Sequence, residues 1–535
     1  MKFISGEKYV LGNMLEEAAH KYKNRTYFIF EGRSYSYREV NDTANRVASG
    51  FANIGVKKGD HVAILMENCP EFVFTWFGLA RIGAVEAPFN PFHKGSILEY
   101  LINYSDAEIL VISSSFIDEI ASIEGSLKSV KKIIISGAFQ GKPFKGIEAI
   151  PFSSLLEAKS SPPHVDVIYK DIMALMFTSG TTGPSKGVLI THNQGFFVAS
   201  QYLSVMGIKG MISGYCYIPL FHEAPQFGIV LGSMFYGGNF VLTRGFSPAD
   251  FWDDIRKYNC TVSGMFEVVI KILLMAPERP DDADNPMQIF STAHISPESQ
   301  LAFEKRFGVK LVNTYGLTEG DCTIVSTYND IVPGSFGKPR GYFEAKLFDA
   351  NDREVARGAT GELVLRSKQP YTIFEGYYKM PEKTLTAWRN LWWHTGDLAY
   401  QDKNGYFFFV GRDKDMIRRG DENISALEVE KVVESHPDIK ECAAVAAYSE
   451  IWGEEVKLAV VCREGRTIHP AELIAFCDER MAYFMVPRYI EFVETIPRTG
   501  ASGRPVKDQL KQINKSTWDR QKAGVKIARE KAKKK

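Results

Sequence analysis

Two short apolar runs enclose a loop rich in glycine and hydroxyl side chains, and this stretch constrains the fold more than any other. The runs are residues 174–177 and 188–190, and the ten residues between them read Thr-Ser-Gly-Thr-Thr-Gly-Pro-Ser-Lys-Gly. We predict a strand, a loop and a second strand, because each run suits a buried strand and glycine permits the tight return. Backbone N–H groups, hydroxyls and the Lys186 ammonium would then face one small space, which suits a polyphosphate.

The order of residues in this loop excludes the Walker A form of a phosphate loop. That motif requires glycine before its lysine and serine or threonine after it, whereas Ser185 and Gly187 stand at those positions. A serine- and glycine-rich surface loop is the alternative interpretation. The ordered alternation of glycines and hydroxyls favours the phosphate loop.

Segments that suit strands alternate with segments that suit helices in the first half of the chain, which is typical of a doubly wound parallel sheet. The expected helices are residues 12–22, 41–54 and 70–83, and the expected strands are residues 27–30, 34–37, 59–65, 85–88, 131–136, 216–222 and 240–243. Alternation and turns at 346–366 predict a β-rich subdomain. Residues 428–492 suit a compact α+β unit, with a domain boundary at 412–415.

Cysteine usage and hydropathy indicate the compartment. The seven cysteines are scattered, their number is odd and none forms a Cys-x-x-Cys pair, which indicates reduced cytosolic thiols. No run of about 18 apolar residues is present, so no transmembrane segment is expected. The first eight residues lack the apolar core of a secretory signal. We therefore expect a cytoplasmic protein.

The formal net charge is zero, but the C-terminal segment is basic. Residues 515–535 hold nine Lys or Arg and two acidic residues. Such a tail could contact nucleic acid, acidic lipid or CoA phosphates. A solvated, frayed helix is the commoner outcome and the one we expect, without a nucleic-acid partner.

A second stretch, residues 313–319, follows an expected strand at 309–312. Glu319 stands at the strand end, where a carboxylate suits a divalent cation that bridges phosphate and protein. Tyr315 offers a flat face for a purine. A core tyrosine is the alternative.

A third stretch holds Asp397 and, farther along, Arg412. Asp397 in a tight turn could accept hydrogen bonds from ribose hydroxyls, or could simply cap its own turn. Arg412 could bind ribose or a phosphate, or could be an ordinary surface arginine.

The order and spacing of these stretches resemble those of the adenylate-forming superfamily, which includes acyl-CoA synthetases, peptide-synthetase adenylation domains and beetle luciferases. The resemblance covers about residues 10–510, through stretches 178–187, 315–319, 392–397, 411–412 and 420–424. Within the superfamily the chain is most similar to the crotonobetaine/carnitine-CoA ligase group. The residues that suggest this group are 68–72, 76–80, 372–377 and 416–420.

The resemblance implies an α/β fold with a large N-terminal domain of doubly wound sheets, a β-barrel-like subdomain and a small mobile α+β C-terminal domain. The implied bounds are 1–412 for the AMP- and acyl-binding domain, 413–510 for the mobile domain and 511–535 for a basic tail. The implied reaction joins a carboxylic acid to ATP as an acyl-adenylate, and CoA then gives a thioester and AMP. Magnesium is the implied metal ion.

The resemblance also implies site residues. The implied ATP- and AMP-binding residues are Thr178, Ser179, Gly180, Thr181, Thr182, Gly183, Lys186, Tyr315, Gly316, Thr318, Asp397 and Arg412. The implied metal residues are Thr182 and Glu319, the CoA path is Gly420, Glu422 and Asn423, and the hinge is Lys414. The implied acyl pocket is His222, Ala293 and His294, and the implied catalytic residues are Thr182, Glu319, Arg504 and His222. A core histidine is the alternative for His222.

The chain departs from the family pattern near its C-terminus. The family ends in Pro-Arg-Thr-x-x-Gly-Lys, and its lysine reaches over the carboxylate and the α-phosphate. Here residues 497–504 contain one extra residue and Arg504 stands at the lysine position. Arginine keeps the charge but lacks the compact geometry of an ammonium, so the rate of adenylation is left open.

We therefore expect an ATP-dependent acyl-CoA synthetase, with a carnitine- or crotonobetaine-like acid as the candidate substrate. Small, aryl, fatty and sterol-side-chain acids are alternatives, as is an adenylate-binding protein with weakened adenylation. A quaternary ammonium would need an aromatic or acidic pocket, for which the candidates are Phe221, Phe227, Phe266 and Glu267. Whether the protein forms a homo-oligomer is left open.

Overall fold

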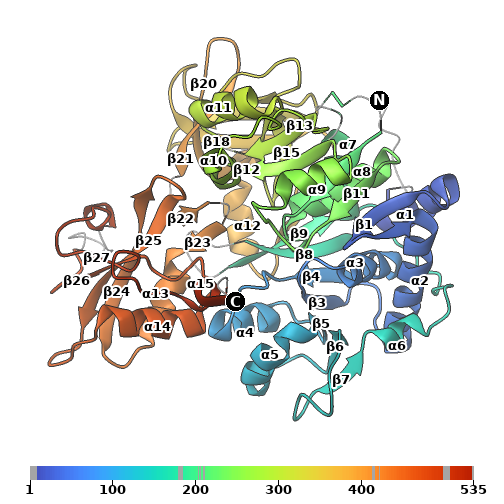
Figure 1. Cartoon of the computed structure of the whole chain (residues 1–535), viewed down its shortest axis with the longest axis horizontal. Helices are drawn as coiled ribbons and strands as arrows, with labels where there is room; N and C mark the ends of the chain where they lie inside the picture. The colour runs from blue at the N-terminus through green and yellow to red at the C-terminus, as the bar shows by residue number, and fades with distance from the viewer. Residues whose placement is uncertain are drawn as a thin grey trace.

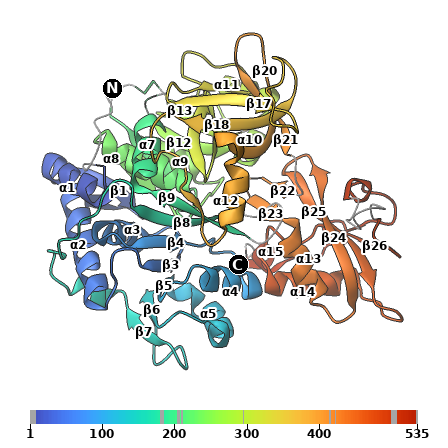
Figure 2. The ribbon, with the colours of Figure 1, turned by 180° about the vertical axis from the view of Figure 1, so that it is seen from behind.

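The computed structural model describes residues 9–178, 185–202, 204, 207–208, 211–293, 295–412, 416–420, 422–497 and 507–532. These residues form three β-sheets with helices between and around them (Figure 1). Two sheets belong to the larger part of the molecule. The third belongs to a smaller part, drawn in orange and red at one side in both views (Figure 1 and Figure 2). This arrangement confirms the expected α/β fold with a large N-terminal and a small C-terminal domain.

The first sheet joins a parallel half to an antiparallel half. The parallel strands are β1 (Thr26–Phe30), β10 (Ser213–Cys216), β11 (Asn239–Leu242), β12 (Val262–Phe266), β13 (Ile289–Ala293) and β14 (Lys310–Leu317), with β2 (Arg33–Ser36) antiparallel to β1 at the edge. The antiparallel strands are β15 (Gly320–Val325), β16 (Ser335–Pro339), β17 (Phe343–Phe348), β18 (Gly361–Ser367), β20 (Trp393–Gln401) and β21 (Phe407–Arg412). Strands β14 and β15 pair with each other and so join the two halves of this sheet. The β-rich region expected around 346–366 is therefore a continuation of the parallel half and not a separate sheet.

The second sheet contains the hairpin that should carry the phosphate loop. Its strands are β3 (His61–Leu65), β4 (Val85–Pro88), β5 (Ile109–Ser113), β6 (Lys132–Ser136), β7 (Glu148–Pro151), β8 (Ile172–Thr178), β9 (Lys186–Thr191) and β19 (Gly376–Tyr377). Strands β8 and β9 are antiparallel, with Thr178 opposite Lys186, which confirms the predicted strand, return and strand. Residues 179–184 lie outside the described residues.

The helices of the larger part pack against both sheets. They include α1 (Leu11–Tyr22), α2 (Tyr37–Asn53), α3 (Pro70–Ile82), α4 (Gly95–Tyr104), α5 (Ile117–Ile123), α6 (Ser153–Leu156), α7 (His192–Tyr202), α8 (Gly232–Phe235), α9 (Phe251–Lys257), α10 (Glu267–Met275), α11 (Pro297–Phe307) and α12 (Pro381–Ala387), with a π-helical segment η4 (Ala224–Leu231). Helix α3 is buried along most of its length and ends at left-handed Gly83, with φ of 69°. It approaches α2 closely, because a Cβ at Gly78 would lie 2.8 Å from Val47 Cγ1.

The third sheet forms the small α+β unit that the sequence predicts. Its strands are β22 (Met416–Arg419), β23 (Glu422–Ser425), β24 (Ile439–Ser449), β25 (Gly453–Cys462), β26 (Tyr489–Phe492) and β27 (Trp518–Asp519), with helices α13 (Ala426–Glu434) and α14 (Pro470–Arg480). The first sheet ends at Arg412 and the third begins at Met416. Residues 413–415 between them, including the expected hinge Lys414, lie outside the described residues.

The basic C-terminal segment is folded onto this small unit, so the expectation of a solvated, frayed helix is wrong for its described part. Strand β27 pairs with β26, and the short helix α15 (Ala528–Ala532) follows. Arg520 is 3% exposed and its guanidinium lies 2.8 Å from Glu530 Oε2. Arg529 lies 3.7 Å from the centre of the Tyr483 ring. Charge counting missed this docking because it ignores which basic side chains find buried partners.

Two strand predictions need correction. The expected strand at 216–222 ends already at Cys216, because Asn68 binds the next backbone groups in place of a neighbouring strand. Its side chain donates to the carbonyl of Ile218 at 3.1 Å and accepts from the N–H of Leu220 at 2.8 Å. The strand expected at 309–312 instead spans Lys310–Leu317, because pairing with β15 prolongs it.

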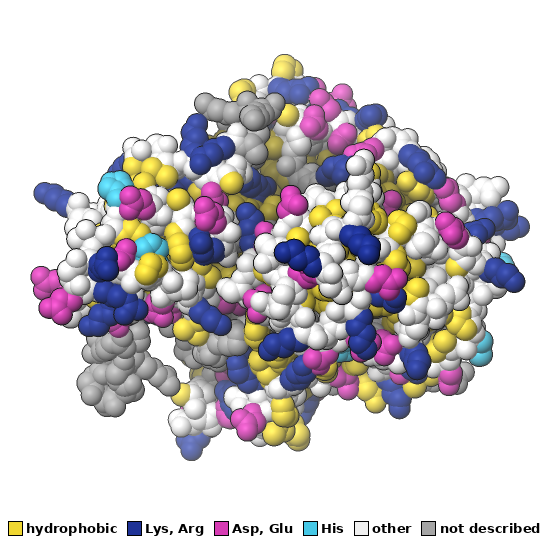
Figure 3. All heavy atoms as spheres, turned by 90° about the horizontal axis from the view of Figure 1, so that it is seen from below, with side chains coloured by type: hydrophobic (Ala, Val, Ile, Leu, Met, Phe, Trp, Pro, Cys, Tyr) yellow, Lys and Arg dark blue, Asp and Glu magenta, His cyan; other side chains and the backbone are white. Residues whose placement is uncertain are grey.

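The surface carries both signs of charge. Lys and Arg side chains are interspersed with Asp and Glu on the face seen from below (Figure 3). Within the described part of the chain, no helix combines the length and apolar character needed to cross a bilayer.

Candidate active site

Two adjoining cavities lie where the larger part of the molecule meets the small unit. The larger has a volume of ≈ 380 Å³, and the smaller has a volume of ≈ 110 Å³. Predicted site residues on the larger cavity are Thr178, Lys186, His222, Ala293, Gly316, Thr318, Glu319 and Asn423. The smaller cavity shares Thr178, His222, Thr318 and Asn423 with it and adds Glu422. The two cavities are therefore neighbours that share part of their walls.

The ends of the phosphate loop are held from several sides. Lys186 lies 4.6 Å from the centre of the Tyr377 ring. Ser185 donates its backbone N–H to Glu428 Oε1 of α13 at 3.0 Å, and its hydroxyl donates to the same oxygen. Burial raises the pKa of Glu428 above its ordinary value, against hydrogen bonds from Ser185 that lower it. The loop is therefore tied directly to the small unit.

Glu319 follows β14 and is 9% exposed. Its Oε1 accepts the Tyr377 hydroxyl at 2.7 Å, and its backbone carbonyl accepts the N–H of Phe374. Gln194 donates to the carbonyl of Thr318 at 3.1 Å. A fixed carboxylate beside a phosphate loop fits Mg²⁺, which commonly takes one or two carboxylates with phosphate oxygens and water. Thr182, the other expected metal residue, lies outside the described residues, as do Ser179, Gly180, Thr181 and Gly183.

Tyr315 and Asp397 come together, but they bind each other. The Tyr315 hydroxyl donates to Asp397 Oδ2 at 2.6 Å, and both side chains are 0% exposed. The Tyr315 ring lies 5.0 Å from that of Phe336. Asp397 pairs with Arg412 across β20 and β21. The expected adenine and ribose residues thus lie beside the cavity and beneath its surface, and their nucleotide contacts stay predictions. The side chain of Arg412 lies outside what the structure describes.

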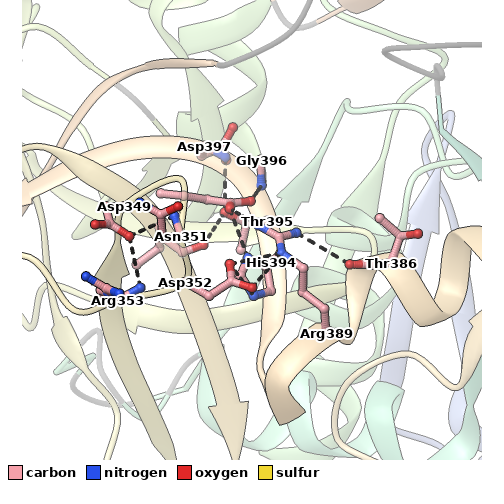
Figure 4. Close-up of polar contacts among 12 residues, drawn as sticks. Asp349, Asn351, Asp352, Arg353, Thr386, Arg389, His394, Thr395, Gly396 and Asp397 are labelled. Atoms are coloured by element: carbon pink, nitrogen blue, oxygen red, sulfur yellow. Dashed lines mark hydrogen bonds and ion pairs between the residues drawn. The ribbon is translucent and has the colours of Figure 1, made fainter.

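Asp397 lies within strand β20 and not in the predicted tight turn, and a charged network supports this irregular part of the strand (Figure 4). Glu362 accepts from the backbone N–H of Gly396 at 3.1 Å and lies 2.9 Å from His394 Nδ1. Arg389, which begins the short 3-10 helix Arg389–Leu391 after α12, lies 2.8 Å from Glu362 and 3.0 Å from Asp352. Burial acts to raise the pKa of Glu362, but His394 and Arg389 together hold it below its ordinary value. The ionised carboxylate therefore orients this part of β20 from behind.

His222 borders both cavities. Its ring lies 4.0 Å from that of Phe221, and burial lowers the pKa of its imidazole to about 4. It is therefore neutral at pH 7. Ala293 ends β13 on the larger cavity, and His294 lies outside the described residues.

The hairpin of β22 and β23 faces the cavities from the small unit. Asn423 borders both cavities, and Glu422 lies 3.4 Å from the amide nitrogen of Asn90. Gly420 has φ of +66°, and a Cβ there would lie 3.2 Å from Trp452 and 3.3 Å from Val268 of α10. Their role toward CoA stays a prediction, as does that of Arg504, which lies outside the described residues.

Besides Glu362, sequence reasoning missed two further acidic residues on the larger cavity, Glu223 and Asp321. Burial raises the pKa of both carboxyls, that of Asp321 to about 6, and the negative charge of Asp321 raises that of Glu223 further. Each stands one or two residues from a predicted site residue, and that proximity was the available signal. Among the candidates for a cation pocket, Phe266 lies on the larger cavity, whereas Glu267 caps α11 through Ser296 and Ser299.

The AMP-binding enzyme family matches residues 15–378, and the AMP-binding enzyme C-terminal domain matches residues 428–502. The chain belongs to the AMP-binding enzyme family. This AMP-binding enzyme is 34% identical, over 540 residues, to a crotonobetaine/carnitine–CoA ligase of Salmonella paratyphi A. That alignment covers 96% of this chain and 100% of the relative.

Solved structures agree with this assignment. The AMP-binding enzyme is similar to an anthranilate CoA ligase in complex with anthranoyl-AMP, at 25% identity and a TM-score of 0.72. That match covers 94% of this chain and 96% of the other. The fold is also that of o-succinylbenzoate CoA synthetase from Bacillus subtilis, at 23% identity, a TM-score of 0.81 and coverage of 95% and 99%. The AMP-binding enzyme is thus an AMP-forming acid–thiol ligase, which uses ATP, CoA and a carboxylic acid.

Proposed function

We propose that this ligase makes the CoA thioester of a small carboxylic acid that carries a quaternary ammonium group, as carnitine and crotonobetaine do. The observation that carries the proposal is the 34% identity to crotonobetaine/carnitine–CoA ligases over 96% of the chain. The neighbouring cavities support it, because they offer one space beside the phosphate loop and another toward the small unit. The reaction would occur where they meet.

In the first step a carboxylate oxygen of the acid bonds to the α-phosphorus of ATP, and the bond from that phosphorus to pyrophosphate breaks. Thr178 and Lys186 flank the loop that would hold the β- and γ-phosphates, and the Lys186 ammonium offsets their negative charge. Thr182 and Glu319 would hold Mg²⁺, which neutralises phosphate charge when bound. Adenylation replaces a poor leaving group, oxide, by a good one, AMP.

In the second step the sulfur of CoA bonds to the acyl carbon, AMP leaves with the bonding electrons and the thiol gives up its proton. Gly420, Glu422 and Asn423 would line the approach of the pantetheine arm from the smaller cavity. His222 borders both cavities, where the acyl carbon and the sulfur would meet. Its neutral imidazole can accept a hydrogen bond from the thiol.

The test measures pyrophosphate and AMP release with a panel of acids, each with and without CoA. The panel contains carnitine, crotonobetaine, 4-(trimethylammonio)butanoate, a short fatty acid, an aryl acid and a sterol-side-chain acid. We expect AMP release to require both an acid and CoA and to be fastest with the ammonium-bearing acids. Fastest turnover of an uncharged acid would keep the ligase and overturn the proposed substrate class.

Arg504 motivates the alternative of a protein that binds adenylates but forms them slowly. The same assay on Arg504→Lys separates the two, because lysine restores the compact ammonium. Silence of both proteins across the panel, with ATP still bound, would favour the binding protein. Faster pyrophosphate release by the variant, with the acid preference unchanged, would mean that Arg504 limits adenylation in a working ligase.

A further inference from the structure

The larger cavity contains a carboxylate that the nucleotide chemistry does not use. Glu223 lies between His222 and the π-helical segment η4. Its Oε2 is shielded from solvent and has no hydrogen-bond partner among the described residues. Within that same set no Lys, Arg or His forms an ion pair with Glu223. Burial removes water from this carboxylate without supplying another hydrogen-bond donor or a positive charge. Its ionised form is therefore unfavourable unless a bound ligand provides such a partner.

Asp321 is a second carboxylate on the same cavity and is held rigidly. It is 9% exposed, and its Oδ1 accepts the N–H of Cys322 at 2.7 Å. A Cβ at Gly316 would lie 1.8 Å from this oxygen, so glycine is needed there for Asp321 to keep its place. The side chain is therefore fixed by local packing and still borders the cavity.

Glu223 and Asp321 lie near Glu319, and the negative charges of Asp321 and Glu319 both act on Glu223. Across the described residues, no three His, Cys, Asp or Glu side chains are grouped so that they could hold a metal ion. The cavity also has an apolar and aromatic part, formed by Tyr202, Ile218, Ile229 and Phe266. Acidic groups among aromatic and aliphatic walls suit an organic cation whose charge is spread over methyl groups.

We propose that Glu223 and Asp321 form the subsite for the ammonium group of the acid and so select cationic acids over neutral ones. This inference rests on the proposed ligase function, which it makes specific. The carboxylates attract the positive charge, and the apolar walls contact its methyl groups. A neutral acid of the same shape would leave Glu223 without a partner, which costs binding energy.

The experiment compares two acids that differ only in charge. They are 4-(trimethylammonio)butanoate and 5,5-dimethylhexanoate, in which carbon replaces the quaternary nitrogen. The measured quantity is the ratio of kcat/KM for the two acids, from CoA-dependent AMP release. This ratio is internal to each protein, so a misfolded fraction cancels. The variants are Glu223→Gln and Asp321→Asn, and the matched control is Glu267→Gln, which loses a charge nearby but outside the cavity.

We expect the wild type to prefer the cationic acid and each cavity variant to lower the ratio by about tenfold or more, as expected for a charge pair shielded from water. The control should keep the wild-type ratio. An unchanged ratio in both cavity variants, or a wild-type preference for the neutral acid, would overturn the subsite while leaving the ligase intact. Loss of the preference in the control as well would also count against it.

A binding measurement keeps the subsite testable if neither acid turns over. Tetramethylammonium chloride is compared with sodium chloride at equal ionic strength, and the melting temperature is recorded for the wild type, Glu223→Gln and Glu267→Gln. We expect tetramethylammonium to raise the melting temperature of the wild type and of Glu267→Gln above the value in sodium chloride. In Glu223→Gln this rise should be lost. No turnover of either acid together with this pattern would reject the proposed acid substrates and keep the cation subsite. Equal melting temperatures of the wild type in the two salts would reject the subsite.

Discussion

At the scale of single residues, Tyr315 and Asp397 are expected nucleotide-site residues whose mutual hydrogen bond also stabilises the fold. The hydroxyl of Tyr315 donates to a carboxylate oxygen that is fully buried. Tyr315→Phe keeps the ring and removes this donor. We expect the free energy of unfolding to fall by about 1.5–3 kcal/mol, the range for a hydrogen bond to a charged group. Urea unfolding followed by tryptophan fluorescence measures the loss.

Tyr378 provides the control for this prediction. Its hydroxyl donates to Asp106 at 2.7 Å, which is the same chemical pair at an exposed position. Tyr378→Phe should cost less than about 0.5 kcal/mol, because water replaces the lost partner. Equal losses in the two variants would contradict the role given to burial.

At the scale of elements, helix α13 is joined to the phosphate loop through Glu428. Two donors of Ser185 bind one oxygen of this carboxylate. We expect Glu428→Ala to release the small unit from the loop and to raise amide exchange in residues 172–191 roughly tenfold, as the loss of about 1.4 kcal/mol would do. Hydrogen–deuterium exchange with mass spectrometry measures this change.

Glu434 of the same helix is the matched control for the loop contact. Its carboxylate accepts the N–H of Cys442 at 3.2 Å, within the small unit. Glu434→Ala should alter exchange in the small unit and leave residues 172–191 unchanged. A rise there in both variants would mean that the helix as a whole, and not the Ser185 contact, controls the loop.

The elements also mark how far sequence reasoning reaches. The hairpin of β8 and β9 was predictable because apolar runs and glycines are local signals. The end of β10 was not, since it depends on Asn68, about 150 residues earlier in the chain. The docking of β27 likewise depends on the distant strand β26.

The residues of the candidate site likewise fall into those that the sequence predicted and those that it did not. Ordered motifs led to Thr178, Lys186, Glu319 and His222, which the structure gathers on one cavity. Glu223 and Asp321 carry no motif. Their placement on the cavity arises from tertiary packing, and one sequence does not reveal it.

At the scale of the whole molecule, buried neutral histidines make stability depend on pH. His192 is 0% exposed, its Nδ1 lies 3.4 Å from the backbone nitrogen of Leu11, and burial lowers its pKa to about 4. In the unfolded chain His192 has a pKa near 6.5, whereas in the folded chain it stays neutral until the pH falls to about 4. The contribution of His192 is therefore complete above pH 6.5 and is lost as the pH falls toward 4.

We expect this histidine alone to cost the fold about 2 kcal/mol between pH 7 and pH 5. His192→Asn removes the titration, so the difference in free energy of unfolding between wild type and variant should shrink by that amount at pH 5. Urea unfolding at both pH values measures it. The exposed His20, replaced in the same way, should leave the pH dependence unchanged. A difference for His192→Asn that stays constant with pH would contradict the prediction.

During synthesis on the ribosome, the hairpin of β1 and β2 emerges long before the strand β11 that pairs with β1. The hydroxyl of Tyr27 binds the carbonyl of Val230, 203 residues farther on, and Phe28 stands opposite Phe240 in the sheet. At about 5–20 residues per second, the hairpin waits roughly 10–40 s for its partners. During that time Tyr27 and Phe28 have only nearby aromatic partners such as Tyr37 and Tyr35, and the unpaired edge of β1 is a natural target for a nascent-chain chaperone. The yield of folded protein should therefore depend on the supply of such chaperones and on the speed of translation.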